Sequence, residues 1–193
     1  VRGGAIVIFT PEELAEMLAV ADGGVKTAIC IGAFAGIRQA EILRLKWEDF
    51  NWAEEVIDLG EDQTKTASRR LVPILPALAA WLADCKKTRG PVLPFKSEKT
   101  LGSAYKAVVG KVNEARPEGQ RNFEWKRNGL RHSYASYRMT EVQDAAKVAL
   151  EMGNSPQKIF NHYRKVVTKS QAIAWFGIMP SAPENVLRIG TAA

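Results

Sequence analysis

The sequence predicts an α+β fold that is mainly helical and contains one small three-stranded antiparallel sheet. Apolar residues recur at helical spacing on both sides of a short central region. In that region, residues 47–75, the pattern changes to short extended pieces separated by turn residues, which is typical of strands. The composition, 46% hydrophobic and 25% charged over 193 residues, indicates one globular domain with its own core.

Three helices are expected before the strands. The first starts with Thr10 as N-cap and Pro11 at the first helical position, and it ends before the Asp-Gly-Gly of residues 22–24. Residues 25–35 are almost all apolar and predict a buried helix. A third helix is expected from about residue 38 to residue 45.

The segment WEDFNWAEEVIDL (47–59) predicts two strands around a turn near Ala53 and Glu54, and RRLVPIL (69–75) predicts a third. Pro73 favours an edge position for this third strand, because proline cannot donate to a neighbouring strand. The connectors RGPVLPF and ARPEGQRN are expected to be irregular. The remaining helices are expected at residues 76–81, 97–114, 127–138, 142–151 and 156–162.

The net charge of +6 and the sequence pI near 9.4 favour a polyanionic partner such as the phosphate backbone of DNA. The alternative is an ordinary solvated surface. The cationic pairs considered as phosphate contacts are Arg69 with Arg70, Lys126 with Arg127, and Arg164 with Lys165.

Cys30 and Cys85 lack the spacing of a metal or redox motif, so we expect buried free thiols and a reducing compartment. No apolar run has the length of a membrane span, which predicts a soluble, cytoplasmic protein without membrane contact.

Four local patterns contain side chains suited to chemistry, although each also has an ordinary structural explanation. Arg38 and Glu41 are three apart and share a helix face, as a surface ion pair would. Arg131 lies beside the apolar stripe of an amphipathic helix. Lys65 is in a polar loop, and Tyr163 stands among cations, where a packing role is the alternative.

Taken in order over about residues 10–176, these patterns resemble the catalytic domain of the tyrosine recombinases, the phage integrase family. AGIRQAEILRLKWEDF resembles the box of the first arginine, Arg38, with Glu41. TKTASRRLVPI resembles the β-hairpin lysine segment and assigns that role to Lys65. NGLRHSYAS resembles the box of the second arginine, Arg131, and GNSPQKIFNHYRKV resembles the segment with the nucleophile, Tyr163.

Two positions depart from the family pattern. Asn128 stands where the family usually has histidine, and Asn154 stands where it has histidine or tryptophan. An amide forms hydrogen bonds but does not accept a proton near neutral pH. His132 and His162 are each one residue away from the family positions, which on a helix turns the side chain by about 100°, so both are considered supporting residues only.

The resemblance implies a site-specific recombinase that cuts and rejoins DNA through a 3′-phosphotyrosyl intermediate. Tyr163 would attack the phosphate, Arg38 and Arg131 would clamp its oxygens, and Lys65 would protonate the leaving oxygen. Glu41 would orient Arg38 or a neighbouring backbone group, and Asn128 and Asn154 would be supporting hydrogen-bonders. Arg164, Lys165 and the arginines would favour the phenolate. No metal and no cofactor is implied.

The two asparagines leave open a catalytically impaired DNA-binding domain of the same fold, and a type IB topoisomerase shares the chemistry. The resemblance divides the chain into a linker from a missing N-terminal core-binding domain (1–9), the catalytic domain (10–177) and a C-terminal tail (178–193). The partner would be double-stranded DNA in a bacterial cytoplasm. We expect a monomer in isolation and a tetramer on DNA, in which residues 172–178 contact a neighbour or, equally, pack on their own domain.

Overall fold

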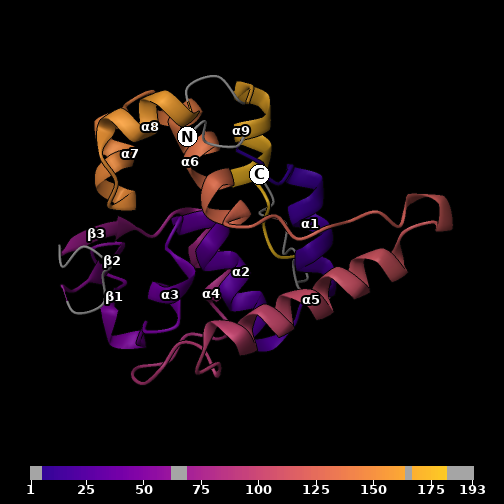
Figure 1. Cartoon of the computed structure of the whole chain (residues 1–193). Helices are drawn as coiled ribbons and strands as arrows, with labels where there is room; N and C mark the ends of the chain where they lie inside the picture. Colours follow the sequence, from indigo (N-terminus) through magenta and orange to yellow (C-terminus); the bar gives the residue numbers. More distant parts are fainter. Residues whose placement is uncertain (1–5, 62–68, 164–166, 182–193) are drawn as a thin grey trace, which may run out of the picture.

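The computed structural model describes residues 6–61, 69–163 and 167–181. A small sheet lies at one side of the molecule, and helices make up the remainder (Figure 1). The helices are α1 (Pro11–Val20), α2 (Gly23–Ala35), α3 (Gln39–Ile42), α4 (Pro76–Leu82), α5 (Glu98–Ala115), α6 (Gly129–Val142), α7 (Ala145–Met152), α8 (Pro156–Tyr163) and α9 (Lys169–Phe176), with short 3-10 turns at Trp47–Asp49 and Glu118–Gln120.

The sheet consists of β1 (Phe50–Asn51), β2 (Val56–Leu59) and β3 (Arg70–Pro73), in the order β1-β2-β3 with both pairs antiparallel. Pro73 belongs to β3, the strand at the end of that order, as expected, and it pairs with Val56 of β2. The predicted fold class, mainly helical with a three-stranded antiparallel sheet, is confirmed.

The third helix is shorter than the 38–45 predicted. Arg38 keeps an extended backbone, with φ −68° and ψ 144°, so the helix begins at Gln39 and covers a single turn. Ile42 and Leu45 are nevertheless buried, because the turns that follow keep both side chains inward.

The main core surrounds α2, whose residues from Thr27 to Ala35 are all buried. Trp175 of α9 belongs to this core: it is fully buried, stacks on Tyr137 at 4.5 Å between ring centroids, and donates from Nε1 to the Ala33 carbonyl at 3.0 Å. In this chain Trp175 therefore packs on its own domain.

A second core joins α6, α7 and α8. Its buried members are Tyr134, Ala135, Val148, Ala149, Met152, Ile159 and Tyr163. Ile159 and Tyr163 are four residues apart and so lie on one face of α8. This packing fixes the end of α8 against α6.

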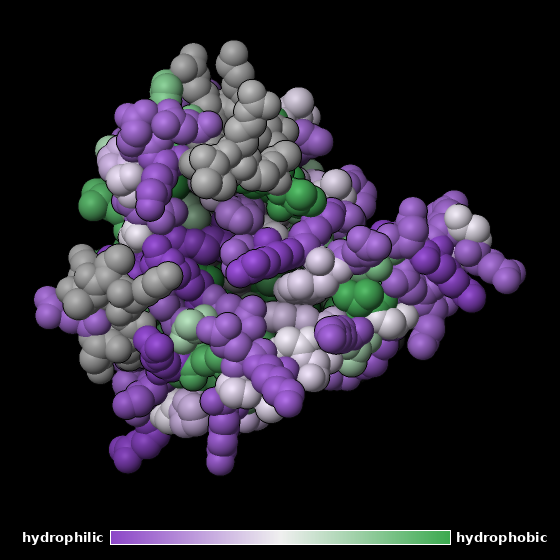
Figure 2. Space-filling view, viewed as in Figure 1, coloured by the Kyte–Doolittle hydropathy of each residue, from purple (hydrophilic) through white to green (hydrophobic). Residues whose placement is uncertain are grey.

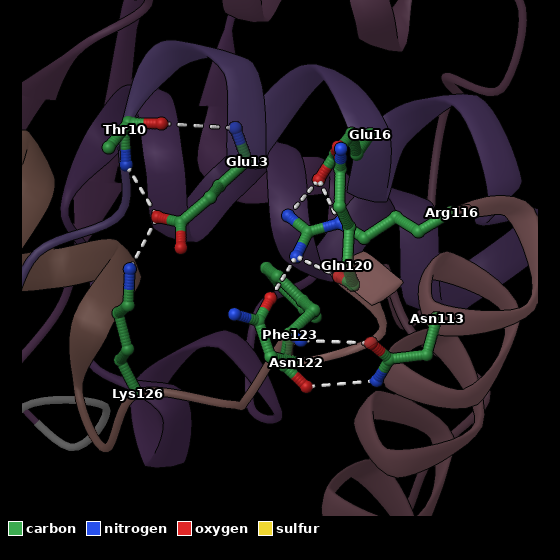
Figure 3. Close-up of polar contacts among 9 residues, drawn as sticks. All are labelled: Thr10, Glu13, Glu16, Asn113, Arg116, Gln120, Asn122, Phe123 and Lys126. Carbon is green, nitrogen blue, oxygen red and sulfur yellow. Dashed lines mark hydrogen bonds and ion pairs between the residues drawn. The ribbon is translucent and has the colours of Figure 1, made fainter. Parts of the chain in front are cut away.

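The start of α1 anchors the chain segment that leads into α6 (Figure 3). Thr10 and Glu13 form a reciprocal cap, and Glu13 also pairs with Lys126. Farther along α1, Glu16 pairs with Arg116 at 2.6 Å. These contacts hold the segment immediately before Arg127.

Replacing Thr10 by alanine is expected to lower the free energy of unfolding by about 1 kcal/mol, because the Glu13 backbone N–H loses its acceptor. Chemical denaturation measures this. Thr140→Ala is the control: its hydroxyl bonds to a carbonyl within α6 and caps nothing, so a change within about 0.5 kcal/mol is expected. Equal losses in the two variants would contradict the capping role.

Phe9 is fully buried, although it precedes the predicted start of the catalytic domain. Its N–H donates to the Ser133 hydroxyl and its carbonyl accepts from the Tyr137 hydroxyl, both on α6. The division of the chain into linker, domain and tail stays a prediction. Cys30 is buried as expected, but the expectation for Cys85 is wrong, since the short α4 leaves it exposed. Within the described ranges, no helix is long and apolar enough to cross a bilayer.

Candidate active site

Three consecutive carbonyl groups at the end of α7 accept hydrogen bonds from three different arginines. The Glu151 carbonyl accepts from Arg70 Nε at 3.3 Å and the Met152 carbonyl from Arg131 Nη2 at 2.7 Å. The Gly153 carbonyl accepts from Arg38 Nη2 at 2.8 Å. Guanidinium groups from α6, β3 and the residue before α3 therefore meet at one helix terminus.

The local sequence explains why α7 can hold them. Gly153 has φ +60°, the left-handed conformation that commonly ends a helix. The last carbonyls of a helix have no partner within it, and the C-terminus is the negative end of the helix dipole. Cationic side chains can donate hydrogen bonds to these carbonyls, and their charge interacts favourably with the negative end of the dipole.

Gly36 plays the corresponding part at the end of α2. Its φ is +62°, and its carbonyl accepts from Arg131 Nη1 at 2.5 Å. A Cβ at this position would lie 2.3 Å from the Tyr134 ring, so the close approach requires glycine. Arg131 is thus fixed between the ends of α2 and α7.

Glu41 is the carboxylate between two of the arginines. It lies 2.9 Å from Arg38 Nη1 and 2.5 Å from Arg70 Nη2, and its side chain is 1% exposed. It also accepts from the backbone N–H of Arg38 at 3.1 Å. Glu41 thus contacts both the side chain and the backbone of Arg38, and its orienting role stays a prediction.

The position of the Arg70 side chain differs from the one expected from the sequence. We expected a phosphate contact, yet its side chain is 7% exposed and both terminal nitrogens contact Glu41. The geometry favours a positioning role behind Arg38. The strand pattern contains a signal for this, because Arg70 and Val72 alternate with the exposed Leu71.

The arrangement leaves an excess of positive charge. Burial and the nearby Arg38 and Arg70 lower the pKa of Arg131 to about 9, so its guanidinium is still charged at neutral pH. Burial raises the pKa of Glu41, but hydrogen bonds and charge from Arg70, followed by bonds from Arg38, outweigh this and lower it overall. Because one carboxylate does not balance the charge of three guanidinium groups, the site favours binding of an anion.

Tyr163, the last residue of α8, is buried with 5% of its surface exposed. Its hydroxyl lies 2.7 Å from Nδ1 of His132 on α6. Burial raises the pKa of the phenol, and Arg131 lowers it by less. The expected net stabilisation of phenolate is therefore not met in this conformation.

A cleft of about 700 Å³ opens beside Arg38 and Arg131. Its lining includes Arg38, Glu41, Arg44, Asn128, Arg131 and His132. Hydrophilic side chains gather across the middle of the face seen in Figure 2, between the part of the molecule with α7 and α8 and the part with the sheet and α3. The cleft therefore joins both catalytic-arginine candidates to the histidine that contacts Tyr163.

The two asparagines lie at the same place. Asn128 lines the cleft from a left-handed backbone conformation, φ +54°, directly before α6. Asn154 accepts from Arg38 Nη2 through Oδ1 at 3.3 Å. Both amides are thus positioned as hydrogen-bonding groups beside the arginines.

The remaining candidates divide into three groups. Arg127 is exposed and lines the cleft, whereas Arg69 is paired with Asp58 at 2.6 Å and Lys126 with Glu13. His162 belongs to α8, but its side chain lies outside the described part of the structure. Three further candidates, Lys65, Arg164 and Lys165, lie outside the described residues altogether.

Two other observations complete the description. Lys158 was not predicted; it lines a second cleft of about 390 Å³ with Arg38 and Arg69. Among the side chains that the structure describes, no group of three or more His, Cys, Asp or Glu residues is arranged to hold a metal ion.

Comparisons with known proteins identify relatives of this chain. The integrase of Escherichia phage P2 is 30% identical over 189 residues, which is 95% of this chain and 48% of the relative. The chain thus spans about half the length of the curated relative it matches.

Solved structures share the fold. The XerA recombinase superposes with a TM-score of 0.64 at 15% identity, over 89% of this chain and 62% of that chain. The Tn1549 transposon integrase, solved with a circular intermediate DNA, gives 0.64 at 18% identity, over 90% and 66%. The fold is therefore that of tyrosine recombinase catalytic domains.

The model of the phage integrase family matches residues 8–169, a span that contains both cleft arginines, Glu41 and Tyr163. With most of its length accounted for in this way, the chain belongs to the phage integrase family.

Proposed function

We propose that this chain catalyses site-specific DNA strand exchange through a 3′-phosphotyrosyl intermediate. The observation that supports the proposal best is the convergence of Arg38, Arg70 and Arg131 on the end of α7, beside a cleft joined to Tyr163 through His132. An anionic phosphodiester suits this excess of cationic groups.

In the proposed reaction the Tyr163 oxygen attacks the scissile phosphorus. A bond from phosphorus to tyrosine forms and the bond from phosphorus to the 5′-oxygen breaks, so the 3′ end of the DNA becomes linked to the protein. Arg38 and Arg131 hold the nonbridging oxygens, and Lys65 protonates the 5′-oxygen. Attack by a 5′-hydroxyl reverses the step, and no external energy source is needed because the ester bond is conserved.

Two positioning roles follow from the contacts. Glu41 fixes Arg38 from one side, and the Asn154 amide with the Gly153 carbonyl fixes it from the other. Asn128 serves as a hydrogen-bond donor to a phosphate oxygen. Arg69, Arg127, Lys126, Arg164 and Lys165 are proposed contacts to the flanking DNA backbone.

The second candidate function is DNA binding without useful catalysis, which is favoured by the amides of Asn128 and Asn154 in the positions of proton-transferring groups. We propose for either function a cytoplasmic site of action on double-stranded DNA, a monomeric free chain, and assembly as a tetramer on DNA. Light scattering with and without duplex tests the assembly.

A nicked duplex library of random sequence tests the catalytic proposal. A nick next to the cleaved bond releases the short 5′-hydroxyl fragment and traps the adduct. We expect a complex that withstands sodium dodecyl sulfate and whose captured DNA ends reveal the target sequence. Low salt is required, because phosphate-dominated binding weakens steeply with ionic strength.

Asn128→His distinguishes the two functions. If the unaltered chain and Asn128→His both bind duplex DNA and neither yields an adduct, the chain is a binding module. An adduct in the unaltered chain establishes the enzyme, and the ratio of the two rates then measures what the amide at this position costs.

A further inference from the structure

We propose that His132 is the base that removes the phenolic proton of Tyr163 during attack on the phosphate. This inference rests on the proposed function and deepens it by assigning a proton acceptor. The observation behind it is the 2.7 Å contact between His132 Nδ1 and the Tyr163 hydroxyl. His132 also lines the cleft that contains both arginines.

The chemistry requires such an acceptor. Tyr163 is buried, and its burial favours the protonated phenol over the phenolate. The proton must therefore leave as the oxygen attacks. The amides of Asn128 and Asn154 cannot take it, and the chain contains only one histidine besides His132.

The fold holds His132 in the required direction. It lies in the first turn of α6, next to Arg131, and neighbouring residues on a helix point about 100° apart. Arg131 accordingly reaches the ends of α2 and α7, while His132 reaches the end of α8. The two rings are tilted by 33° with centroids 5.9 Å apart, so the contact is made edge to edge through the polar atoms rather than by stacking.

The proton balance is complete. With its own hydrogen on Nε2, the neutral imidazole accepts the phenolic hydrogen at Nδ1 and becomes imidazolium as the bond from oxygen to phosphorus forms. When the 5′-hydroxyl of the DNA strand reverses the reaction, the same proton returns to the departing tyrosine. The proton for the 5′-oxygen comes separately, from Lys65 in the proposed mechanism.

The charged side chains that share a cleft with His132 are mostly cationic. Those of the main cleft are Arg38, Glu41, Arg44, Glu98, Arg127 and Arg131. A third cleft, which His132 also lines, adds Glu124 and Lys126. A bound phosphate would compensate the positive charge that the imidazole gains, which ties proton removal to the presence of DNA.

Two substitutions separate proton transfer from positioning. In His132→Asn the amide replaces the Nδ1 edge of the ring and keeps a hydrogen-bond partner for Tyr163, but it cannot become protonated. In His132→Ala the partner is removed. We expect single-turnover cleavage of the nicked duplex to slow by about 10²- to 10⁴-fold in both variants. In both, the fall of the unaltered chain's rate at acid pH should also disappear, since an imidazole changes charge between about pH 5 and 8.

Added imidazole provides the second measurement. Rescue of His132→Ala by imidazole, increasing with the basicity of substituted imidazoles, would support a base. A substrate with sulfur in place of the 5′-bridging oxygen needs no proton on its leaving group, so the variants should remain slow on it.

If His132 only positions Tyr163, His132→Asn should keep both the cleavage rate and its pH profile. That result would overturn the inference. The adduct on Tyr163 would still support the proposed function. Failure of imidazole to rescue a folded His132→Ala, as judged by its thermal midpoint, also overturns it. Absence of any adduct with the unaltered chain rejects the proposed function itself.

Discussion

A Tyr163→Phe chain is expected to bind duplex DNA as the unaltered chain does and to form no covalent adduct. Phenylalanine keeps the ring in the second core against Ile159 and Met152, so the fold is preserved. It removes the oxygen that would attack phosphorus in the proposed reaction, together with the hydrogen bond to His132, whose loss costs about 1 kcal/mol in stability. Denaturing gel analysis on the nicked duplex, with filter binding in parallel, measures both properties.

Tyr105→Phe is the matched control. Tyr105 is also buried, and it stacks at 4.0 Å on Trp125, which lines the same cleft. The Tyr105→Phe substitution removes one phenolic oxygen from the neighbourhood of the site and leaves the proposed nucleophile unchanged. The adduct should therefore form at close to the unaltered rate. An adduct that persists in Tyr163→Phe would show that another side chain attacks, and peptide mapping of the linked DNA would identify it.

The elements were predictable because their signals are local. Caps such as Thr10, the apolar run of α2 and the alternation around Pro73 act over a few residues each, and the helices and strands formed where these signals lie. Two helices are exceptions: α9 was not among those expected, and α3 is shorter than expected. There, Arg38 leaves helical geometry to reach Gly153, a contact across 115 residues that no local pattern contains.

The sequence names candidate site residues but not the contacts between them. The family resemblance selects Arg38, Arg131 and Tyr163. The structure places both arginines in one cleft and Tyr163 in contact with His132, which lines that cleft. The resemblance does not reveal that backbone carbonyls hold the arginines. Every residue has a backbone carbonyl, so no sequence pattern marks the ones that accept these hydrogen bonds. The contact of His132 with Tyr163 depends on how α6 packs against α8, so spacing alone could not establish it.

At Arg70 two local signals in the sequence conflict, and the prediction followed the wrong one. Two adjacent arginines in a basic chain favour a phosphate contact, whereas the strand alternation places the second of them inward with Val72. The inward position is possible only because Glu41 supplies a buried carboxylate 29 residues earlier in the chain. Pairing across that distance is tertiary information.

Glu41→Gln is expected to destabilise the chain by about 3–5 kcal/mol, the usual cost of removing one partner of a buried ion pair. Glutamine keeps the size of the side chain, but it leaves Arg38, Arg70 and Arg131 without their shared carboxylate. Urea denaturation near neutral pH measures the loss. Glu98→Gln is the control: this carboxylate lines the same cleft but is exposed at the start of α5, so its removal should cost no more than about 1 kcal/mol.

The pH dependence provides an independent check on the same carboxylate. The folded state lowers the pKa of Glu41 below its ordinary value of 4.5, so its ionised form contributes stability above that pH and loses the contribution as the pH falls through the lower, folded-state value. The difference in unfolding free energy between the unaltered chain and Glu41→Gln should therefore be constant near neutral pH and shrink below pH 4.5. Added sulfate should restore part of the variant's stability, because an anion bound among the three guanidinium groups replaces the missing charge. A difference that stays constant into the acid range would mean that the loss comes from altered packing and not from the charge of Glu41.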